Sequence, residues 1–169
     1  MVDDVEKPTS GLTTDEVWGA LQEVMDPEIP VVSLVDLGVV RSVHTQDRTA
    51  HVEMTPTFSG CPAMEVMRQQ VRERLLALGC DRVEIAIKLD PPWTTDWLSD
   101  EVKAKLRDFG LAPPRWHGGN VRLVLSEPTA CPYCGSLDTE LKNGFGSTLC
   151  RSIYVCHACR QPFEAFKPI

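Results

Sequence analysis

Helical periodicity comes first along the chain, over residues 12–25. Thr13 and Glu16 form the capping-box pattern, in which a threonine hydroxyl and a glutamate three residues later satisfy free N–H groups at a helix start. Apolar residues then recur at spacings of three and four: Val17, Leu21, Val24 and Met25. Because Asp26-Pro27 follows, and a residue before proline disfavours helix, the pattern predicts one amphipathic helix that ends there.

Alternation with a period of two replaces the helical pattern over 38–45 and 49–55. Gln46-Asp47-Arg48 separates the two runs, so the sequence predicts a β-hairpin. A second helix is predicted to start at Pro62 and to stop at Gly79, because these residue types are favoured at the first helical position and just past the last. Its apolar face comprises Met64, Met67, Val71, Leu75 and Leu78. We expect this face to pack across the hairpin.

A third alternating run, 83–89, and a third helical pattern, 99–109, complete the first unit. The last helix is expected to turn Val102, Leu106 and Phe109 inward. The order helix, strand, strand, helix, strand, helix predicts an α+β domain, in which helices cover one face of a small three-stranded sheet.

Composition divides the chain further. Residues 1–11 are polar and acidic and are expected to be a flexible N-terminus, which leaves 12–112 as the α+β domain. Proline and glycine mark 113–127 as a linker, with a short strand predicted at 121–125. The remaining unit, 128–169, has too few residues to be held together by apolar burial alone, so a metal is expected to stabilise it.

Two CxxC pairs lie in this last unit: Cys131, Cys134, Cys156 and Cys159. Each CxxC turn places two thiolates on one side of a knuckle, and two such turns complete the tetrahedron that zinc prefers. The sequence therefore predicts a C-terminal four-cysteine zinc ribbon, with strands near 148–155 and 163–166. Protein ligands fill all four positions, so the metal is expected to be structural rather than catalytic. Tetrahedral thiolate also suits iron, as in a rubredoxin-like site, and zinc and iron both stay open.

The seven cysteines are expected to be reduced, because the chain starts with an acidic, polar segment and not with a secretory signal. No apolar run reaches the ~18 residues of a membrane helix, so a cytoplasmic protein with no membrane partner is predicted. The formal net charge of -7 removes the basic surface that phosphate binding needs. The ribbon unit contains four basic and three acidic residues, and four thiolates on Zn2+ would add negative charge. Nucleic acid is therefore not an expected partner.

Cys61 is the thiol of the first domain that is placed for chemistry, immediately before the predicted helix start at Pro62. The free N–H groups and dipole of a helix start stabilise an anion, which predicts a lowered thiol pKa and a reactive thiolate. The alternative is a buried cysteine that only caps the helix. Asp26 and Glu28 are either oxygen ligands beside Cys61 or turn formers with solvated charge. Cys80 follows a glycine at a helix-to-strand turn and is expected to be buried.

Some residues carry two interpretations. Cys150 is either an additional metal ligand or a small buried hydrophobe. Trp93, Trp97 and Trp116 are either anchors of a protein interface or packing residues between the linker and the core. The sequence has no Gly-rich phosphate loop, Ser-His-Asp set or His-carboxylate iron motif, which argues against an enzyme.

Together these motifs resemble the PaaD family, the fourth subunit encoded with the bacterial phenylacetyl-CoA epoxidase (ring 1,2-monooxygenase) system. The resemblance extends over nearly the whole chain. In the first domain it is carried by Asp26-Pro-Glu-Ile-Pro30, Asp36-Leu-Gly38, Thr55-Pro-Thr57, Ser59-Gly-Cys-Pro-Ala63 and Pro92-Trp-Thr-Thr-Asp-Trp97. In the ribbon it is carried by Phe145-Gly-Ser-Thr148, Cys150 and the two CxxC pairs. The first domain also resembles the wider family that includes SufT and the eukaryotic cytosolic iron-sulfur targeting factor.

The resemblance implies that Asp26, Glu28, Thr57 and Cys61 are the functional positions, and it extends to Cys150 as an auxiliary thiol. It implies a non-enzymatic factor that assists insertion of an iron–sulfur cluster or iron into the epoxidase system of aerobic phenylacetate degradation. The implied partners are the reductase and oxygenase components and the general iron–sulfur assembly machinery. A cluster takes about four ligands, so one Cys61 per chain implies a homodimer that shares the cluster, or a client or carrier that supplies the other ligands.

The competing hypothesis is a structural, non-catalytic subunit of the multicomponent oxygenase complex, in which Cys61 is merely buried. Stoichiometric co-purification with the oxygenase would favour that hypothesis. A zinc-ribbon protein that binds nucleic acid is a third hypothesis, and the acidic net charge disfavours it.

Overall fold

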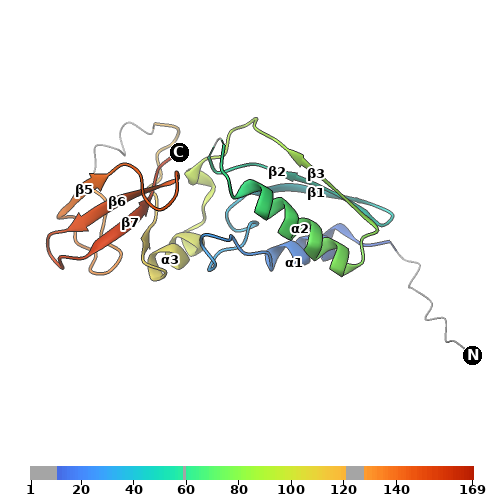
Figure 1. The fold of residues 1–169 in the computed structure, drawn as a ribbon, viewed down its shortest axis with the longest axis horizontal. Helices are drawn as coiled ribbons and strands as arrows, with labels where there is room; N and C mark the ends of the chain where they lie inside the picture. The colour runs from blue at the N-terminus through green and yellow to red at the C-terminus, as the bar shows by residue number, and fades with distance from the viewer. Residues whose placement is uncertain (1–10, 59, 121–127) are drawn as a thin grey trace, which may run out of the picture.

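The chain folds into two lobes, an α+β lobe and a smaller all-β lobe that holds the C-terminal residues (Figure 1). A computed structural model describes residues 11–58, 60–120 and 128–169. The elements of the first lobe are α1 (Thr14–Gln22), β1 (Val40–Gln46), β2 (Thr49–Met54), α2 (Met64–Leu78), β3 (Arg82–Ile87), the 3-10 helix η1 (Thr95–Trp97) and α3 (Asp100–Asp108). The elements of the second sheet are β4 (Leu111–Ala112), β5 (Thr139–Asn143), β6 (Arg151–Cys156) and β7 (Pro162–Phe166).

The first sheet has the strand order β1-β2-β3. β1 and β2 form the predicted antiparallel hairpin, whereas β3 pairs parallel to β2 because α2 carries the chain back across the sheet. On the central strand, Ala50, Val52 and Met54 are buried and alternate with partly exposed residues. The opposite face of the sheet carries ion pairs, such as the one between Lys88 Nζ and Glu53 Oε1, which lie 3.0 Å apart. The fold class predicted from the sequence is confirmed: a three-stranded sheet with helices, followed by a cysteine-rich β unit.

The helix ends follow from local chemistry. Thr13 and Glu16 form the predicted capping box, with the Glu16 N–H donating to the Thr13 hydroxyl at 3.2 Å and the Thr13 N–H donating to the Glu16 carboxylate at 2.8 Å. Gly79 ends α2 in the left-handed region, at φ 113°, which glycine enters at little steric cost.

Two details of the prediction differ from the structure. The predicted inward orientation of Phe109 was wrong: this residue follows the last turn of α3 and is 43% exposed. The third strand also ends earlier than predicted, at Ile87, and Leu89 is exposed.

The second sheet has the strand order β4-β7-β6-β5. β6 and β7 correspond to the two strands predicted in the ribbon, and β5 joins β6 as an antiparallel edge strand. β4 comes from the end of the predicted first domain, yet it pairs parallel to β7, with Leu111 opposite Glu164. The two lobes are thus joined by backbone pairing as well as by the covalent chain.

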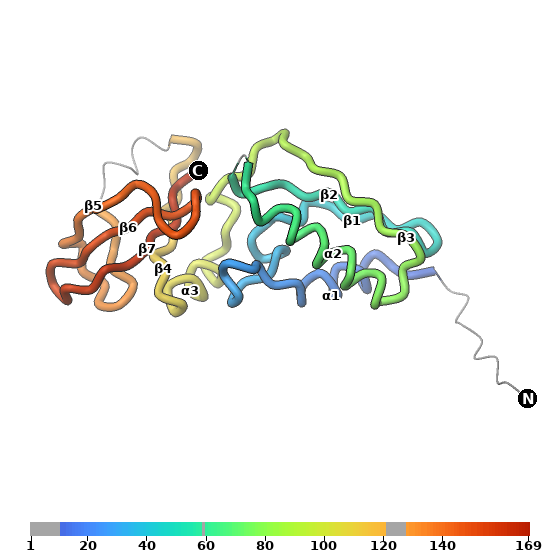
Figure 2. Tube along the Cα trace, in the orientation of Figure 1, coloured from blue at the N-terminus to red at the C-terminus, as the bar shows by residue number. Residues whose placement is uncertain are grey.

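Side chains from the segment before α3 fasten the lobes together. Trp93 is buried, its indole N–H donates to the Leu37 carbonyl at 2.8 Å, and its ring lies 5.9 Å from that of Phe166. The Thr95 N–H donates to the Ile169 carbonyl at 3.0 Å. Figure 2 shows the C-terminal residues lying beside this connection. Packing is therefore the role that the structure gives to Trp93, whereas Trp116 is 71% exposed.

Two sequence predictions concern segments that the structure leaves undescribed. The strand predicted at 121–125, and all but the last residue of the N-terminal segment 1–11, lie outside the described residues. Among the residues that are described, no helix has the length and apolar character needed to cross a bilayer.

Candidate functional site

The four ribbon cysteines converge on one point. All four sulfurs lie within 4.8 Å of one another, with Cys131 Sγ 3.7 Å from Cys159 Sγ and Cys134 Sγ 3.6 Å from Cys156 Sγ. A tetrahedron with metal–sulfur bonds of about 2.3 Å has edges of about 3.8 Å, so the sulfur positions fit a tetrahedral ion. The predicted four-cysteine metal-binding site is present, and this donor set suits zinc or iron.

Local backbone geometry presents these thiols. Cys131 and Cys134 lie on a turn in which the Gly135 N–H donates to the Cys131 carbonyl at 2.9 Å, and Cys156 is the last residue of β6. The Cys159 backbone N–H lowers the pKa of the Cys156 thiol to about 7. The pKa of Cys159 rises to about 12, because burial and the neighbouring sulfurs outweigh the backbone N–H of Gln161. Crowded thiols cannot all ionise unaided, and a bound divalent cation removes their mutual repulsion.

A second site is a cavity of about 230 Å³ where the two lobes meet. It contains every candidate residue of the first domain: Asp26, Glu28, Thr57 and Cys61. The first two come from the turn after α1, Thr57 follows β2, and Cys61 precedes α2. Phe145, Leu149, Cys150 and Phe166 of the ribbon lobe complete the wall. Residues far apart in the sequence therefore share one partly enclosed space.

The Asp26 turn is locally ordered and acidic. Asp26 is only 5% exposed, and its Oδ1 accepts hydrogen bonds from the Glu28 and Ile29 N–H groups, both at 2.8 Å. Burial raises the pKa of Asp26 despite those two N–H groups. Burial also raises the pKa of Glu28, and the nearby Asp26 charge adds to that shift.

The electrostatic prediction for Cys61 was wrong. The helix begins at Met64 with Ala63 as its N-cap, so Cys61 lies two residues before the cap. Burial raises the pKa of the Cys61 thiol, and the charges of Glu28 and Asp26 raise it further, which outweighs the backbone N–H groups of Ala63 and Met64. The surroundings of Cys61 thus favour the neutral thiol until a positive charge enters the cavity.

The other two cysteines outside the ribbon cluster differ in position. Cys80 is 5% exposed within the hydrophobic core, as predicted, and it does not line the cavity. Cys150 is partly buried, lines the cavity, and has its Sγ 3.1 Å from the Thr148 hydroxyl. Burial raises the pKa of Cys150 as well.

The comparisons with known proteins agree with this two-part arrangement. Residues 14–87 match the family described as "Iron-sulfur cluster assembly protein", and residues 120–167 match the "PaaD zinc beta ribbon domain". A protein of Escherichia coli (strain K12), named as one of the subunits of a "Putative 1,2-phenylacetyl-CoA epoxidase", is 41% identical over 91% of this chain and 92% of its own length. The chain belongs to the PaaD family.

Other relatives of this PaaD-family chain match little more than half of it. A Bacillus subtilis (strain 168) protein named "Fe-S protein maturation auxiliary factor YitW" is 36% identical over 54% of this chain and 91% of its own length. A solved structure of a domain of unknown function from Bacillus anthracis has a TM-score of 0.51 at 28% identity, covering 55% of this chain and 90% of its own. A conserved hypothetical protein from Thermotoga maritima gives the same TM-score at 30% identity, with coverage of 59% and 98%. These relatives are covered over nearly their whole length, so they are shorter than this chain.

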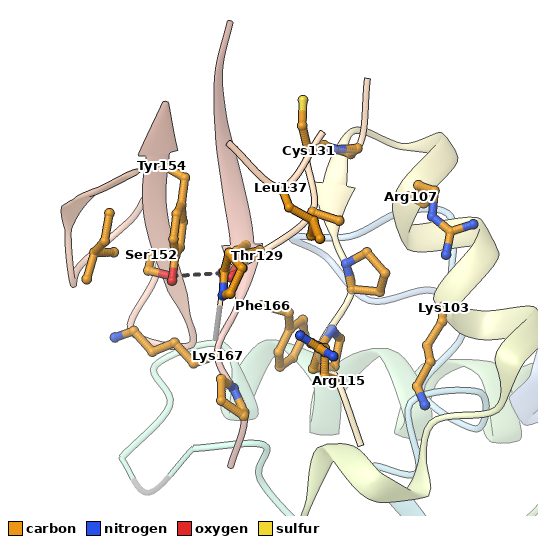
Figure 3. Close-up of a pocket in the computed structure, with 18 of the residues that line it drawn as sticks. Lys103, Arg107, Arg115, Thr129, Cys131, Leu137, Ser152, Tyr154, Phe166 and Lys167 are labelled. Carbon is orange, nitrogen blue, oxygen red and sulfur yellow. Dashed lines mark hydrogen bonds between the residues drawn. The ribbon is translucent and has the colours of Figure 1, made fainter. Parts of the chain in front are cut away.

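A larger cavity, of about 1070 Å³, lies between α3 and the ribbon sheet (Figure 3). Its lining includes one acidic residue, Asp100, and four cationic ones: Lys103, Arg107, Arg115 and Lys167. Figure 3 shows Lys103 and Arg107 projecting from α3, on the opposite side from Tyr154 and Ser152 of β6. This cationic cavity does not include the Cys61 site, and sequence reasoning did not find it because α3 and the ribbon are brought together only by the fold.

The sequence pattern did not identify two further residues that hold the structure together. Arg151 is nearly buried and donates to the Glu164 carboxylate and to the Glu28 carbonyl, both at 2.9 Å, so it links β6 to the acidic turn. His117 is buried in the predicted linker, where its N–H donates to the Asp96 carboxylate at 2.8 Å and its ring nitrogen lies 3.0 Å from the Ile169 carbonyl. Neither residue lies in a recognisable motif, so nothing in the sequence indicated that Arg151 and His117 form these contacts.

Proposed function

We propose that this protein is a non-enzymatic maturation factor that carries iron or an iron–sulfur cluster transiently on Cys61. Asp26 or Glu28 assists, and the ribbon lobe docks the client. The client is a component of the phenylacetyl-CoA epoxidase system, either its reductase or its oxygenase. The names of the relatives support this proposal, since one is named as an epoxidase subunit and another as a maturation auxiliary factor.

The observation that carries the proposal is the gathering of thiol and carboxylate groups in one cavity. Cys61, Asp26, Glu28 and Thr57 come from three separate segments and line the same space of about 230 Å³. Its described lining includes no cationic side chain. Burial raises the pKa of both Asp26 and Glu28 and outweighs the charge of the nearby Arg151, which lowers them. Such a cavity favours a cationic, thiophilic cargo.

The ligand arrangement favours transfer over storage. Among the described residues, only the four ribbon cysteines form a group of three or more His, Cys, Asp or Glu side chains that could hold a metal ion. The Cys61 cavity is therefore not a closed cage like the ribbon site. A site with open coordination positions allows a client to supply the remaining ligands and to remove the cargo.

The cationic cavity between α3 and the ribbon supports docking of an acidic client segment. Lys103, Arg107 and Lys167 line this cavity in a chain whose formal net charge is -7. Local positive charge on an acidic protein attracts a short acidic segment, whereas the net charge repels a long polyanion such as nucleic acid.

The experiment measures metal content in the two epoxidase components. Iron and acid-labile sulfide are determined in reductase and oxygenase isolated from cells that have the protein, lack it, or carry Cys61→Ala. We expect deletion and Cys61→Ala to lower the iron or cluster content of one component at unchanged protein abundance. The matched control is Cys80→Ala, a thiol of the same lobe that lies outside the cavity.

The same cells distinguish the proposal from a structural subunit. Fully loaded reductase and oxygenase are mixed without this chain and assayed. If they are active alone, the maturation role stands. Loaded components that stay inactive until the chain is added back would show a working subunit of the oxygenase complex, and the maturation proposal would fail.

A further inference from the structure

The ribbon segment that closes the Cys61 cavity includes a second thiol. Phe145, Gly146, Ser147, Thr148, Leu149 and Cys150 all line that cavity. This segment comes from the ribbon lobe, and it precedes β6, whereas Cys61 precedes α2 in the other lobe. The two thiols are therefore 89 positions apart in the numbering but face one space.

The segment is held in place by its own hydrogen bonds. The Glu164 carboxylate accepts from the Ser147 N–H at 2.6 Å, and the Lys167 N–H donates to the Cys150 carbonyl at 2.9 Å. A Cβ on Gly146 would lie 2.7 Å from Glu164 Oε1 and 2.9 Å from Arg151 Cβ, so this position has no room for a side chain. These contacts fix Cys150 as part of the cavity wall.

Cys150 and Cys61 line the same cavity, and the charge of Cys61 is felt at Cys150. Both thiols pack against the same hydrophobic cluster. Burial raises the pKa of Cys150; the Thr148 hydroxyl and the Arg151 charge lower it, and the Glu28 and Cys61 charges add to the rise, so the net shift is upward. The two thiols and the carboxylates of Asp26 and Glu28 thus form one group of acids in a common environment.

We propose that Cys61 and Cys150 together form a two-thiol site, assembled across the two lobes, that binds an iron–sulfur cluster as cargo. This inference rests on the proposed function and adds the ribbon's own thiol to it. The two sulfurs supply half of the roughly four ligands that a cluster takes, so the client or a carrier supplies the rest. A cavity of about 230 Å³ is larger than a single ion requires, which favours a cluster over one bare metal ion.

The test uses the full-length, zinc-loaded protein. It is reconstituted anaerobically with ferric iron, a thiol reductant that supplies the electrons for any ferrous iron, and sulfide, and iron, sulfide, zinc and the visible absorption of thiolate-ligated iron are measured. We expect Cys61→Ser and Cys150→Ser each to weaken cluster binding at least about tenfold, since even residues that only support metal ligands change affinity by that much. The double variant should be no worse than either single one. Cys80→Ser, the control, should bind as the unaltered protein does.

A second measurement avoids substitutions. The unaltered protein is alkylated with and without the reconstituted cluster, and the labelled cysteines are identified by mass spectrometry. We expect the cluster to protect both Cys61 and Cys150. This readout decides the question even if Cys150→Ser loses its zinc and unfolds.

The outcomes separate the two proposals. If the cluster protects only Cys61, and Cys150→Ser binds it normally, the two-thiol site is wrong while the maturation proposal stands. If the unaltered protein binds no cluster and neither thiol is protected, the two-thiol site and cluster carriage by Cys61 both fail. Binding of ferrous iron without sulfide, with both thiols protected equally, would replace the cluster by a single ion and overturn the cargo assignment.

Discussion

At the scale of single residues, the cavity between the lobes gathers buried acids, and the charge of the nearby Arg151 does not offset that burial at Asp26, Glu28 or Cys150. The pKa values of Asp26, Glu28, Cys61 and Cys150 are all raised, and burial is the largest cause at each. A metal cation reverses this balance, because it favours the deprotonated forms that act as ligands. Cargo binding should therefore release protons and strengthen as the pH rises.

Asp26→Asn should stabilise the empty protein while weakening cargo binding. A carboxyl group with a raised pKa supports folding fully below its unfolded value, near 3.8, and loses that contribution as pH rises through the folded pKa. The amide oxygen of asparagine can still accept the two backbone N–H groups without carrying charge. We expect a gain of about 1 kcal/mol in unfolding free energy at neutral pH, vanishing in acid.

Denaturant unfolding at a series of pH values checks this prediction. Asp138→Asn, at an exposed position of the ribbon, should give no such pH-dependent gain. A neutral-pH loss of stability in Asp26→Asn would mean that the two hydrogen bonds require the carboxylate charge, and that burial is not the dominant effect.

At the scale of elements, the ribbon depends on its metal. Replacing Cys131 or Cys156 by serine, or removing the metal with a chelator, should unfold β5, β6 and β7, since structural zinc contributes ~10 to 16 kcal/mol in small domains. The first lobe should keep its helices, because its core is built from α1, α2 and the first sheet. Metal analysis should find close to one tightly bound zinc per chain, and circular dichroism should show partial loss of structure. Four freely alkylated thiols in native, metal-free protein would contradict this.

The elements of the first lobe were predictable because their signals are local. The capping box at Thr13, the glycine at position 79 and the alternation through Val52 depend only on neighbours in sequence. β5 was missed because its residues are polar and mostly exposed, so no apolar alternation marks it. β4 was missed because its two residues become a strand only by pairing with β7.

The candidate site was predictable only as separate pieces. Family motifs pointed to Cys61, Asp26 and Glu28, and the two CxxC pairs pointed to the metal site. The sequence could not show that Cys150 shares the Cys61 cavity, since that proximity requires the packing of one lobe on the other. Its pattern also gave the wrong direction for the Cys61 pKa, because burial and neighbouring carboxylates are tertiary effects.

At the scale of the whole molecule, Arg151 links the ribbon to the acidic turn. Its side chain is 8% exposed, one nitrogen donates to Glu164 of β7, and another donates to the Glu28 carbonyl of the first lobe. Trp93 and His117 also fasten the lobes, whereas Arg151 directly follows Cys150 and holds the backbone of Glu28, and both of these residues line the cavity. The relative position of Cys61 and Cys150 should therefore depend on this arginine.

Arg151→Lys should open the cavity without removing the ribbon metal. A lysine keeps the charge but cannot reach both partners as the planar guanidinium does, so one hydrogen bond of a charged group is lost, at a cost of about 2 kcal/mol. We expect Cys61 to be alkylated faster, zinc content to be unchanged, and both lobes to stay folded. The matched control is Arg160→Lys, at an exposed position of the ribbon. If Cys61 is labelled at the same rate in both variants, the lobes are held by the Trp93 and His117 contacts alone and Arg151 does not govern access to the site.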